Sequence, residues 1–365
     1  MIFILAIILL YFIFLTLIIK RFISEPNYIA KNTANISVNV IVAFKNEGNN
    51  IKNLINYLKA QNYNNQLVNY ILINDNSNDN SLEIAQKETL NDQRFRVLNL
   101  ENTTGKKQAL KYGLSYAKNQ LIIHTDADVI FNKNWINTFA SYYKEMDFKL
   151  ALAPVLYTNE LGFFQKLQSL EITNIAGITA GSALLKIPLM ANGANLAYSN
   201  DLIPIFIESI NKKASGDDMF FLEKVKKIFS DKISYIKSQD TTVYTFAETN
   251  IKNFFNQRIR WIGKSNTFKN TLIIIVSLLA ILVNILSVIA LILIIFHTKF
   301  TLIFLSFLII KFIAESITAI IYIKYYNKLN LALFIPLLFI IYPFYIIFTG
   351  ISSLFIKPKW KNTNI

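Results

Sequence analysis

The residues best suited to chemistry in this chain are two aspartates that follow an apolar run. Residues 121–125 have the composition of a buried strand, and Asp126 and Asp128 come directly after it. Alternate residues of an extended segment lie on the same side, so both carboxylates can reach one point beyond the strand. In open α/β sheets that end of a strand is where ligands bind. Paired carboxylates there suit a divalent cation that holds a phosphate-bearing substrate, whereas a solvated turn is the competing interpretation.

The composition narrows this chemistry. The chain has no cysteine and only two histidines, His124 and His297, which excludes disulfides and Cys-ligated metals and leaves acid–base work to carboxylates. The mean hydropathy of +0.37 is high for a soluble protein, and the net charge of +14 favours an anionic partner. Because apolar segments flank a Lys-rich domain, we interpret the charge as suited to a membrane surface and predict no nucleic-acid partner.

Strands that alternate with helices are predicted around the aspartates. Strands are expected at residues 38–43, 68–73, 95–100 and 121–125. Helices are expected from residue 51, where apolar residues recur with helical spacing, and over residues 105–118. An Asn- and Asp-rich turn at residues 74–79 can cap the helix after it. This alternation predicts an α/β fold with a parallel sheet.

Short motifs also follow one another in a recognisable order. They are Ala43–Glu47, Asn74–Ser77, Gly105–Leu110, Asp126–Asp128, Asn192–Tyr198, Ser215–Asp218 and Gln257–Trp261. As a set they resemble glycosyltransferase family 2, and the later ones are similar to its membrane-bound branch, which includes cellulose and hyaluronan synthases and ceramide glucosyltransferase-like enzymes. The resemblance implies a GT-A (Rossmann-like) nucleotide-sugar domain with a mixed, mostly parallel sheet, and an inverting transfer from a nucleotide-activated sugar. Each motif is weak by itself, and the order makes the set specific.

For the leaving diphosphate, such a transfer implies a Mg²⁺ or Mn²⁺ ion acting as a Lewis acid. Asp128 is the predicted metal ligand, and Asp126 is expected beside it on the metal or the nucleotide. Lys106 opens a helix whose free N–H groups, together with its cation, suit a diphosphate. The neighbouring Lys107 is expected on a solvated face.

The nucleoside is assigned to the ends of the first two strands. Asp75 is predicted to accept the imide N–H of uracil, and capping of the next helix is its alternative role. The family usually has two aspartates in this turn, and Asn74 replaces the first of them. Glu47 is expected at the ribose, although the helix dipole alone would favour an acidic residue in a first helical turn.

The acceptor hydroxyl needs a base, and the Gly-Asp-Asp motif supplies two carboxylates. Asp218 is the predicted base by its position in the motif, and Asp217 stands where the family more often has Glu. Repulsion between the adjacent carboxylates is expected to raise one pKa toward useful base strength. The alternative is that Asp217 caps the following helix.

The acceptor side is assigned to two later motifs. Asn195 is expected to line the acceptor pocket from the Asn-Gly-Ala-Asn segment. Gln257 shares a helix face with Arg260 and Trp261. Arg260 is predicted to bind diphosphate and Trp261 to stack on a sugar ring, with Arg258 in the same motif. Arg and Trp beside a membrane span are also ordinary interfacial anchors, which is the competing interpretation.

Long apolar segments predict membrane helices on both sides of one soluble domain. The predicted parts are an anchor at 1–21, a domain at 35–270 with donor half 35–130 and acceptor half 131–270, membrane segments at 271–296, 301–323 and 331–356, and a basic tail at 357–365. Cations beside the first two spans put the domain on the cytoplasmic side. Prolines leave a re-entrant or surface-lying hairpin open for the last segment. Residues 161–198 are expected either to lie on the membrane or to form a buried helix.

Together these features predict an inverting, metal-dependent glycosyltransferase, a multi-pass protein of the inner (cytoplasmic) membrane. The expected donor is a nucleotide-sugar, most simply a UDP-sugar, and the expected acceptor is a lipid or lipid-linked glycan at the cytoplasmic face. A processive polysaccharide synthase is the alternative within this class, although the C-terminal segments are few for a translocation pore. A catalytically silent, membrane-tethered nucleotide-sugar-binding protein is the alternative outside it.

Overall fold

The structure is a computed structural model that describes residues 2–31, 33–101, 103–210, 217–263, 270–296, 301–356, 359–360 and 363–364. The chain forms two compact units. Residues 25–158 and 182–246 make up the sheet unit, and residues 1–24, 159–181 and 247–365 make up the helical unit. Residues 159–181 and 247–263 of the predicted soluble domain therefore belong to the unit that holds the apolar helices.

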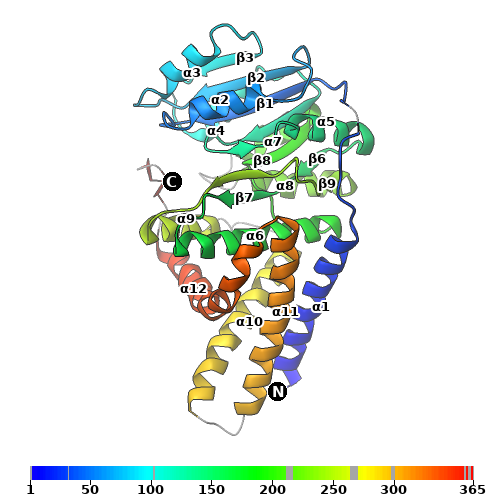
Figure 1. Cartoon of the computed structure of the whole chain (residues 1–365), viewed down its shortest axis with the longest axis vertical. Coiled ribbons are helices and arrows are strands. Elements are labelled where there is room, and N and C mark those ends of the chain that lie inside the picture. The colour runs from blue at the N-terminus through cyan, green and yellow to red at the C-terminus, as the bar shows by residue number, and fades with distance from the viewer. Residues whose placement is uncertain are drawn as a thin grey trace. The chain divides into compact units, whose positions relative to one another are not determined.

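A seven-stranded sheet forms the centre of the sheet unit, in the order β3-β2-β1-β4-β8-β6-β9 (Figure 1). Its strands are β1 (Val38–Phe44), β2 (Val68–Asn74), β3 (Phe95–Asn99), β4 (Leu121–Thr125), β6 (Leu150–Leu152), β8 (Asn195–Ser199) and β9 (Ile233–Tyr235). The first four strands are parallel, β8 is antiparallel to β4 and β6, and β6 is parallel to β9. The predicted mixed, mostly parallel sheet is confirmed.

Helices cover both faces of the parallel strands. α2 (Ile51–Lys59) packs on the face that carries Val40 and Val42. α4 (Lys106–Leu114) packs on the opposite face, where Gly113 lies so close to β2 that an added Cβ would be 2.5 Å from Ile73 Cδ1. α4 ends at Leu114 instead of residue 118, because the chain tightens there into i→i−3 hydrogen bonds.

The sheet unit also contains further helices and a second, smaller sheet. The helices are α3 (Ser81–Thr89), α5 (Trp135–Met146), α7 (Ile203–Ile210) and α8 (Asp217–Ile228), with the short turns η1 (Asn200–Leu202) and η2 (Ser230–Lys232). A small second sheet, in the order β5-β10-β7, consists of β5 (Ile130–Phe131), β7 (Val155–Thr158) and β10 (Val243–Phe246). This second sheet brings β10 beside the chain that leaves β4.

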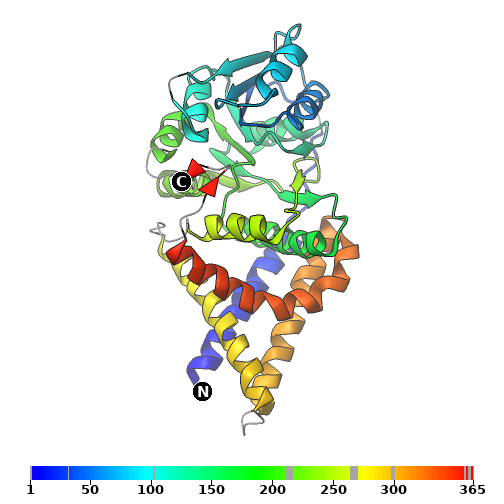
Figure 2. The same ribbon diagram turned by 90° about the vertical axis from the view of Figure 1, so that its left-hand side faces the viewer.

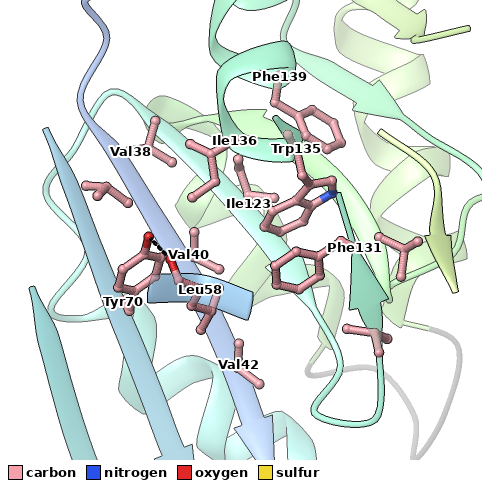
Figure 3. Packing of buried hydrophobic residues seen from close by; sticks show 14 of the residues in the cluster. Val38, Val40, Val42, Leu58, Tyr70, Ile123, Phe131, Trp135, Ile136 and Phe139 are labelled. Carbon is pink, nitrogen blue, oxygen red and sulfur yellow. Dashed lines mark hydrogen bonds between the residues drawn. The ribbon is translucent and has the colours of Figure 1, made fainter. Parts of the chain in front are cut away.

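The core of the sheet unit lies between the parallel strands, α2 and α5 (Figure 3). Trp135 of α5 stacks on Phe131 with ring centroids 4.5 Å apart. The Tyr70 hydroxyl of β2 donates a hydrogen bond of 2.7 Å to the Leu58 carbonyl, so this buried polar atom is satisfied. Dense packing of this kind holds the strand ends rigidly.

The carboxyl ends of β1, β2 and β4 lie side by side, because β1 pairs with both of the others. The chain leaves β1 on one side to form β2 and β3, then returns to its other side to form β4. Such a switch point is where open α/β sheets bind ligands. In the antiparallel pair beside it, Asn195 of β8 lies opposite Thr125 of β4, which brings the segment before β8 to the same edge.

Among the described residues, four helices are long and apolar enough to cross a membrane: Ala6–Ser24, Thr271–Ile295, Thr301–Tyr325 and Leu329–Phe355. They belong to α1 (Ile2–Ser24), α10 (Thr271–Ile295), α11 (Thr301–Tyr325), and the short turn η4 (Leu329–Phe334) with α12 (Ile335–Phe355). α10 and α11 form a V in Figure 2, and α12 crosses between the two arms at the wide end. α1 packs against both α10 and α11 (Figure 1). Within α11, Lys311 pairs with Glu315 at 2.8 Å, and the Tyr11 hydroxyl of α1 donates to the same carboxylate at 2.6 Å.

The helical unit also contains most of α6 (Phe163–Leu184), up to Gly181, and α9 (Ile251–Gly263). α6 is buried along most of its length. Its Leu170 packs in a cluster with Ala319, Ile323 and Leu331. Of the two interpretations of residues 161–198, the structure supports the buried helix. A short pair of strands, β11 (Lys359–Trp360) and β12 (Thr363–Asn364), ends the described chain.

Candidate active site

Asp126 and Asp128 extend from the end of β4, where the strand prediction puts them. Lys106, in the first turn of α4, forms an ion pair with Asp126 through its Nζ atom. On the other carboxylate, the Thr245 hydroxyl of β10 donates a hydrogen bond of 3.3 Å to Asp128 Oδ2. The two acidic groups are therefore held by side chains from two separate elements of the sheet unit.

Burial and neighbouring charges shift the pKa values of two groups at the end of β4, Asp128 and Lys106. Burial raises the pKa of the Asp128 carboxyl to about 6, and the negative charges of Asp126 and Glu47 add to the shift. Burial would lower the pKa of Lys106, but attraction to Asp126, Asp217 and Asp128 outweighs it and raises that pKa. One lysine is therefore within electrostatic reach of both predicted metal-side carboxylates and of the Gly-Asp-Asp motif.

Asp75 follows β2 and is 1 % exposed. Its Oδ1 accepts hydrogen bonds from the Gly105 N–H at 2.6 Å and the Thr104 hydroxyl at 3.2 Å. Its Oδ2 lies 3.9 Å from Lys45 Nζ and has no hydrogen-bond partner within the described parts of the chain. Asp75 does not cap α3: the N-cap is Asn80, and the Ser81 N–H at the start of the helix donates to Asp79 Oδ1 at 3.1 Å. A buried carboxylate oxygen without a donor is an available acceptor for a ligand N–H.

Glu47 lies in the turn between β1 and α2. Its carboxylate accepts a hydrogen bond of 2.7 Å from the Asn50 amide, and its carbonyl accepts the N–H groups of Asn50 and Ile51. Glu47 thus lies at the start of α2 and bonds its first residues, as expected if its role is at the helix start and not at a ribose. Its charge also reaches Asp128, so the same position is compatible with a role at the strand ends.

Asp217 and Asp218 form the first turn of α8. Asp217 Oδ1 lies 2.8 Å from Lys107 Nζ in an ion pair. Asp218 Oδ2 accepts the Gly193 N–H at 3.2 Å, and its Oδ1 accepts the Met219 N–H at 2.9 Å. One carboxylate is thus held by a cation from α4, and the other faces the segment that precedes β8.

The surroundings of Asp217 perturb the pKa of its carboxyl. Burial raises it, the hydrogen bond and charge of Lys107 oppose the increase, and repulsion from Asp218 adds to it. Burial, and not the expected repulsion from Asp218, is the main cause of this shift. Ser215 and Gly216 of the same motif lie outside the described residues.

Comparisons with known proteins bear on this geometry. Residues 39–205 match the family described as Glycosyl transferase family 2. The match to glycosyltransferase family 2 thus covers just under half of the chain, and we call the sheet unit, which holds most of the matched residues, the family 2 domain. A curated relative, the glycosyltransferase GlyG of Streptococcus pneumoniae serotype 4, is 36% identical over 110 residues, which cover 30% of this chain and 36% of that protein. The chain therefore matches only about a third of that relative's length.

Among solved structures, the mannosyltransferase PcManGT from Pyrobaculum calidifontis, in complex with GDP-Man and Mn²⁺, superimposes with a TM-score of 0.55 at 15% sequence identity. The match covers 96% of this chain and 95% of that chain. At this identity the likeness shows the fold alone. The family 2 domain has the GT-A fold implied by its motifs.

Asn195 of the family 2 domain is an internal support, which corrects its predicted place in an acceptor pocket. It is 1 % exposed. Its Nδ2 donates to the Pro154 carbonyl at 2.8 Å and the Thr241 carbonyl at 2.7 Å, and its Oδ1 accepts the Trp135 indole N–H at 3.1 Å. Because β8 buries this side chain inside the unit, its amide serves the protein and does not face a ligand.

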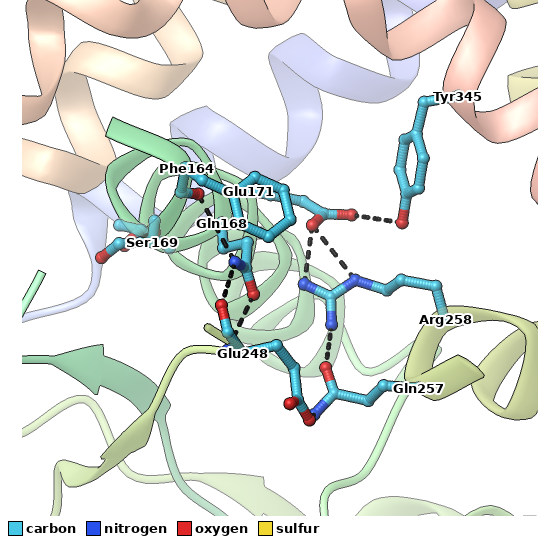
Figure 4. Close-up of polar contacts among 9 residues, drawn as sticks. Phe164, Gln168, Ser169, Glu171, Glu248, Gln257, Arg258 and Tyr345 are labelled. Carbon is cyan, nitrogen blue, oxygen red and sulfur yellow. Dashed lines mark hydrogen bonds and ion pairs between the residues drawn. The ribbon is translucent and has the colours of Figure 1, made fainter. Parts of the chain in front are cut away.

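The Gln257–Trp261 motif lies in α9 of the helical unit. Arg258 is 2 % exposed, and its Nη2 binds Glu171 Oε2 at 2.7 Å (Figure 4). Its guanidinium also lies over the Trp261 ring, 4.3 Å from the centroid. A cation enclosed in this way contacts neither an acceptor nor a membrane surface. The prediction of Arg258 as an acceptor-side contact is therefore wrong, because its charge is used inside the unit.

Lys107, Thr245 and Glu171 hold residues of these motifs, and none of the three is predicted from the sequence to do so. Lys107 is expected on a solvated face, but its Nζ binds Asp217 and the Ile210 carbonyl, the latter at 2.9 Å. Thr245 carries no sequence signal. Glu171 does carry one, because it is a carboxylate in an apolar segment with sparse charge, where burial requires a partner.

Asp126 and Asp128 of the family 2 domain fit a divalent cation as part of its coordination. Within the described residues, no group of three or more His, Asp or Glu side chains could hold a metal ion. Mg²⁺ is commonly bound by one or two carboxylates together with substrate phosphates. A crowded pair of carboxylates, one with a raised pKa, is the kind of donor set that such a cation stabilises.

Proposed function

We propose that the family 2 domain transfers a sugar, with inversion, from a nucleotide-sugar to a lipid or lipid-linked glycan at the cytoplasmic face of a membrane. One observation carries the proposal: two adjacent lysines of α4 pair with carboxylates from both predicted sets, Lys106 with Asp126 and Lys107 with Asp217. Carboxylates suited to the donor and to the acceptor thus lie within electrostatic reach of each other. A single transfer reaction requires this proximity.

The donor, most simply a UDP-sugar, is proposed to bind across the ends of β1, β2 and β4. Asp75 Oδ2, which accepts no hydrogen bond from the described residues, would accept an N–H of the base, with Glu47 at the ribose. Asp128 and Asp126 would hold Mg²⁺ or Mn²⁺, which when bound would stabilise the charge of the leaving diphosphate. Lys106 and the first N–H groups of α4 would add positive charge there. The GDP-Man and Mn²⁺ in the PcManGT complex support this class of donor and cation.

Asp218 is proposed as the general base. It would take the proton of the acceptor hydroxyl while that oxygen bonds to the anomeric carbon, and the bond from this carbon to the diphosphate oxygen would break on the opposite side. Two contacts support Asp218 over Asp217. Asp218 faces Gly193, in the segment that reaches the edge of β4, whereas Asp217 is paired with Lys107.

The acceptor side is proposed to include Gln257, Arg260 and Trp261. The support is their match to the motif of the membrane-bound branch, and the fact that α9 belongs to the same compact unit as the four apolar helices. Lys20 and Arg21, at the end of the first apolar run, support a cytoplasmic position for the residues that follow. A lipid acceptor would then be presented by the membrane itself.

Transfer is tested with purified full-length protein in detergent, Mn²⁺ or Mg²⁺, a panel of labelled UDP- and GDP-sugars, and extracted membrane lipids. We expect label from one donor to move to one lipid fraction. Asp218→Asn should lower that rate by about 10²- to 10⁴-fold, as for loss of a general base, without weakening UDP binding. Asp147→Asn, which alters an exposed carboxylate paired with Lys232, should leave the rate unchanged.

Each other outcome points to a different function. Long insoluble product would favour a processive polysaccharide synthase. UDP binding without transfer from any donor would favour a catalytically silent binding protein. Full transfer by Asp218→Asn would remove Asp218 as the base and direct attention to Asp217.

A further inference from the structure

The buried Arg258 binds the carboxylate of Glu171, which also accepts a hydrogen bond from a third helix. Its Nε and Nη2 donate to Glu171 Oε2 at 3.1 and 2.7 Å. The other carboxylate oxygen, Oε1, accepts the Tyr345 hydroxyl of α12 at 3.1 Å. Both oxygens of Glu171 on α6 are therefore engaged, one from α9 and one from α12 (Figure 4).

The same guanidinium touches two residues proposed for the acceptor side. Its Cζ lies over two rings, 4.3 Å from the Trp261 centroid and 4.7 Å from the Phe254 centroid. Its Nη1 donates to Gln257 Oε1, and Gln257 Nε2 donates in turn to Glu248 Oε1 at 3.2 Å. One buried side chain thus sets the surroundings of both an aromatic ring and an amide.

Stability alone does not account for an ion pair in this position. Removing two charges from water is costly, and apolar residues of similar size often replace buried pairs without loss. A planar guanidinium can bind a carboxylate through more than one N–H and stack on aromatic faces at the same time, which a lysine cannot do. We therefore interpret the ion pair as a device that fixes the orientation of the guanidinium, and not as a main source of folding stability.

We infer that Arg258, held by Glu171 and Tyr345, is a positioning residue that orients Trp261 and Gln257 for the acceptor. This inference rests on the proposed function, which gives those two residues to the acceptor side. Tyr345 lies in a helix long and apolar enough to cross a membrane. The membrane segment thereby takes part in setting the acceptor residues, although it supplies no catalytic group.

The test uses the full-length protein in detergent with Arg258→Lys, Glu171→Gln and Tyr345→Phe. Glu160→Gln is the matched control. The carboxylate of Glu160 is also partly buried in the helical unit, where it forms an ion pair with Lys328. The first readout is ¹⁹F NMR of protein labelled with 5-fluorotryptophan. The chain has three tryptophans, and Trp261→Phe identifies the resonance of interest.

The second readout is transfer from the donor identified in the panel to phosphatidylglycerol vesicles doped with a polyprenyl phosphate. We expect Arg258→Lys to shift the Trp261 resonance and to raise the KM for the doped lipid roughly ten- to hundredfold, because small misplacements have large effects on positioned reactants. The KM for the nucleotide-sugar should stay within about twofold, since the donor contacts are untouched. Glu171→Gln should act in the same direction and Tyr345→Phe more weakly.

The resonance of Trp135, which is 0 % exposed in the core of the sheet unit, reports whether each variant is folded. If Arg258→Lys fails to fold, Glu171→Gln and Tyr345→Phe decide the question. A Trp261 resonance that is unmoved in the folded variants would overturn the inference, as would equal changes in Glu160→Gln. Wild-type protein that transfers to no lipid would instead overturn the proposed function, and the Trp261 resonance would still decide whether Arg258 orients that ring.

Discussion

The Asp128 carboxyl keeps its proton to a higher pH than an ordinary aspartate. Burial is the main cause and the charges of Asp126 and Glu47 add to it, which raises its pKa to about 6. A carboxyl must lose its proton to ligate a cation, so protons and metal compete for this residue. A bound cation would in turn relieve the repulsion among the three carboxylates.

We therefore expect Mn²⁺ to bind the protein–UDP complex more weakly as the pH falls below about 6. The expected loss is about tenfold per pH unit, because each bound cation displaces one proton, and the affinity should level off at higher pH. The measurement is the Mn²⁺ concentration that gives half of the full increase in the thermal unfolding midpoint, from about pH 5 to about pH 8.

Asp128→Asn should abolish this response to pH and weaken Mn²⁺ binding throughout. Asp147→Asn is the control, because Asp147 is exposed and has a φ of 46° that Asn also tolerates. Mn²⁺ binding that is independent of pH in the wild type would contradict the assignment of Asp128 as a ligand.

The start of α4 connects the base-binding and diphosphate-binding parts of the proposed site. Gly105 has a φ of 114° and a ψ of 140°, a conformation almost restricted to glycine. It points the Gly105 N–H at Asp75 and puts Lys106 beside Asp126. The sharp turn of one residue thus serves two carboxylates, which follow β2 and β4 on the two sides of β1.

Gly105→Ala should destabilise the protein by about 1–3 kcal/mol through backbone strain and weaken UDP binding. A Cβ there would meet no atom within 4 Å, so a steric clash would not explain the loss. Gly350→Ala also adds a Cβ in open space, but at a residue without positive φ within α12, and should leave the midpoint equal or slightly higher. Equal thermal midpoints and equal UDP affinities in the two variants would show that the turn at Gly105 is not required.

The two compact units alternate along the chain. Most of α6 lies between the two stretches of the sheet unit, and α9 follows the second stretch, yet both helices belong to the helical unit. Leu170 of α6 is buried against Ala319 and Ile323 of α11. The rings of Phe254 and Tyr345, from α9 and α12, have centroids 5.4 Å apart. A cut after α9 would therefore expose apolar surface of α6 and α9 that packs on α11 and α12.

A chain reduced to residues 25–263 should aggregate in buffer without detergent, because large exposed apolar faces drive association. Size-exclusion chromatography with light scattering checks this, with the full-length protein in detergent as the control. A monodisperse reduced chain that binds UDP with wild-type affinity would show that α6 and α9 do not depend on α11 and α12.

Much of the sheet and of the donor side could be predicted without a structure. Apolar runs with turn residues between them predict β1, β2, β3 and β4, and the parallel order of such strands brings their carboxyl ends together. Asp75, Asp126 and Asp128 follow those ends directly in the chain, so their positions depend on neighbours a few residues away. The apolar segments of α1, α10 and α11 are likewise evident from local composition.

Partner choice and burial, in contrast, depend on residues that are distant in the chain. Arg258 and Glu171 are 87 positions apart, and no periodic pattern links them. Asn195 looks like a pocket residue in its motif, yet β8 buries it among groups from three other segments. Lys107 looks solvated until α8 brings Asp217 to it. Desolvation and pairing are properties of three-dimensional neighbours, so these assignments required the folded chain.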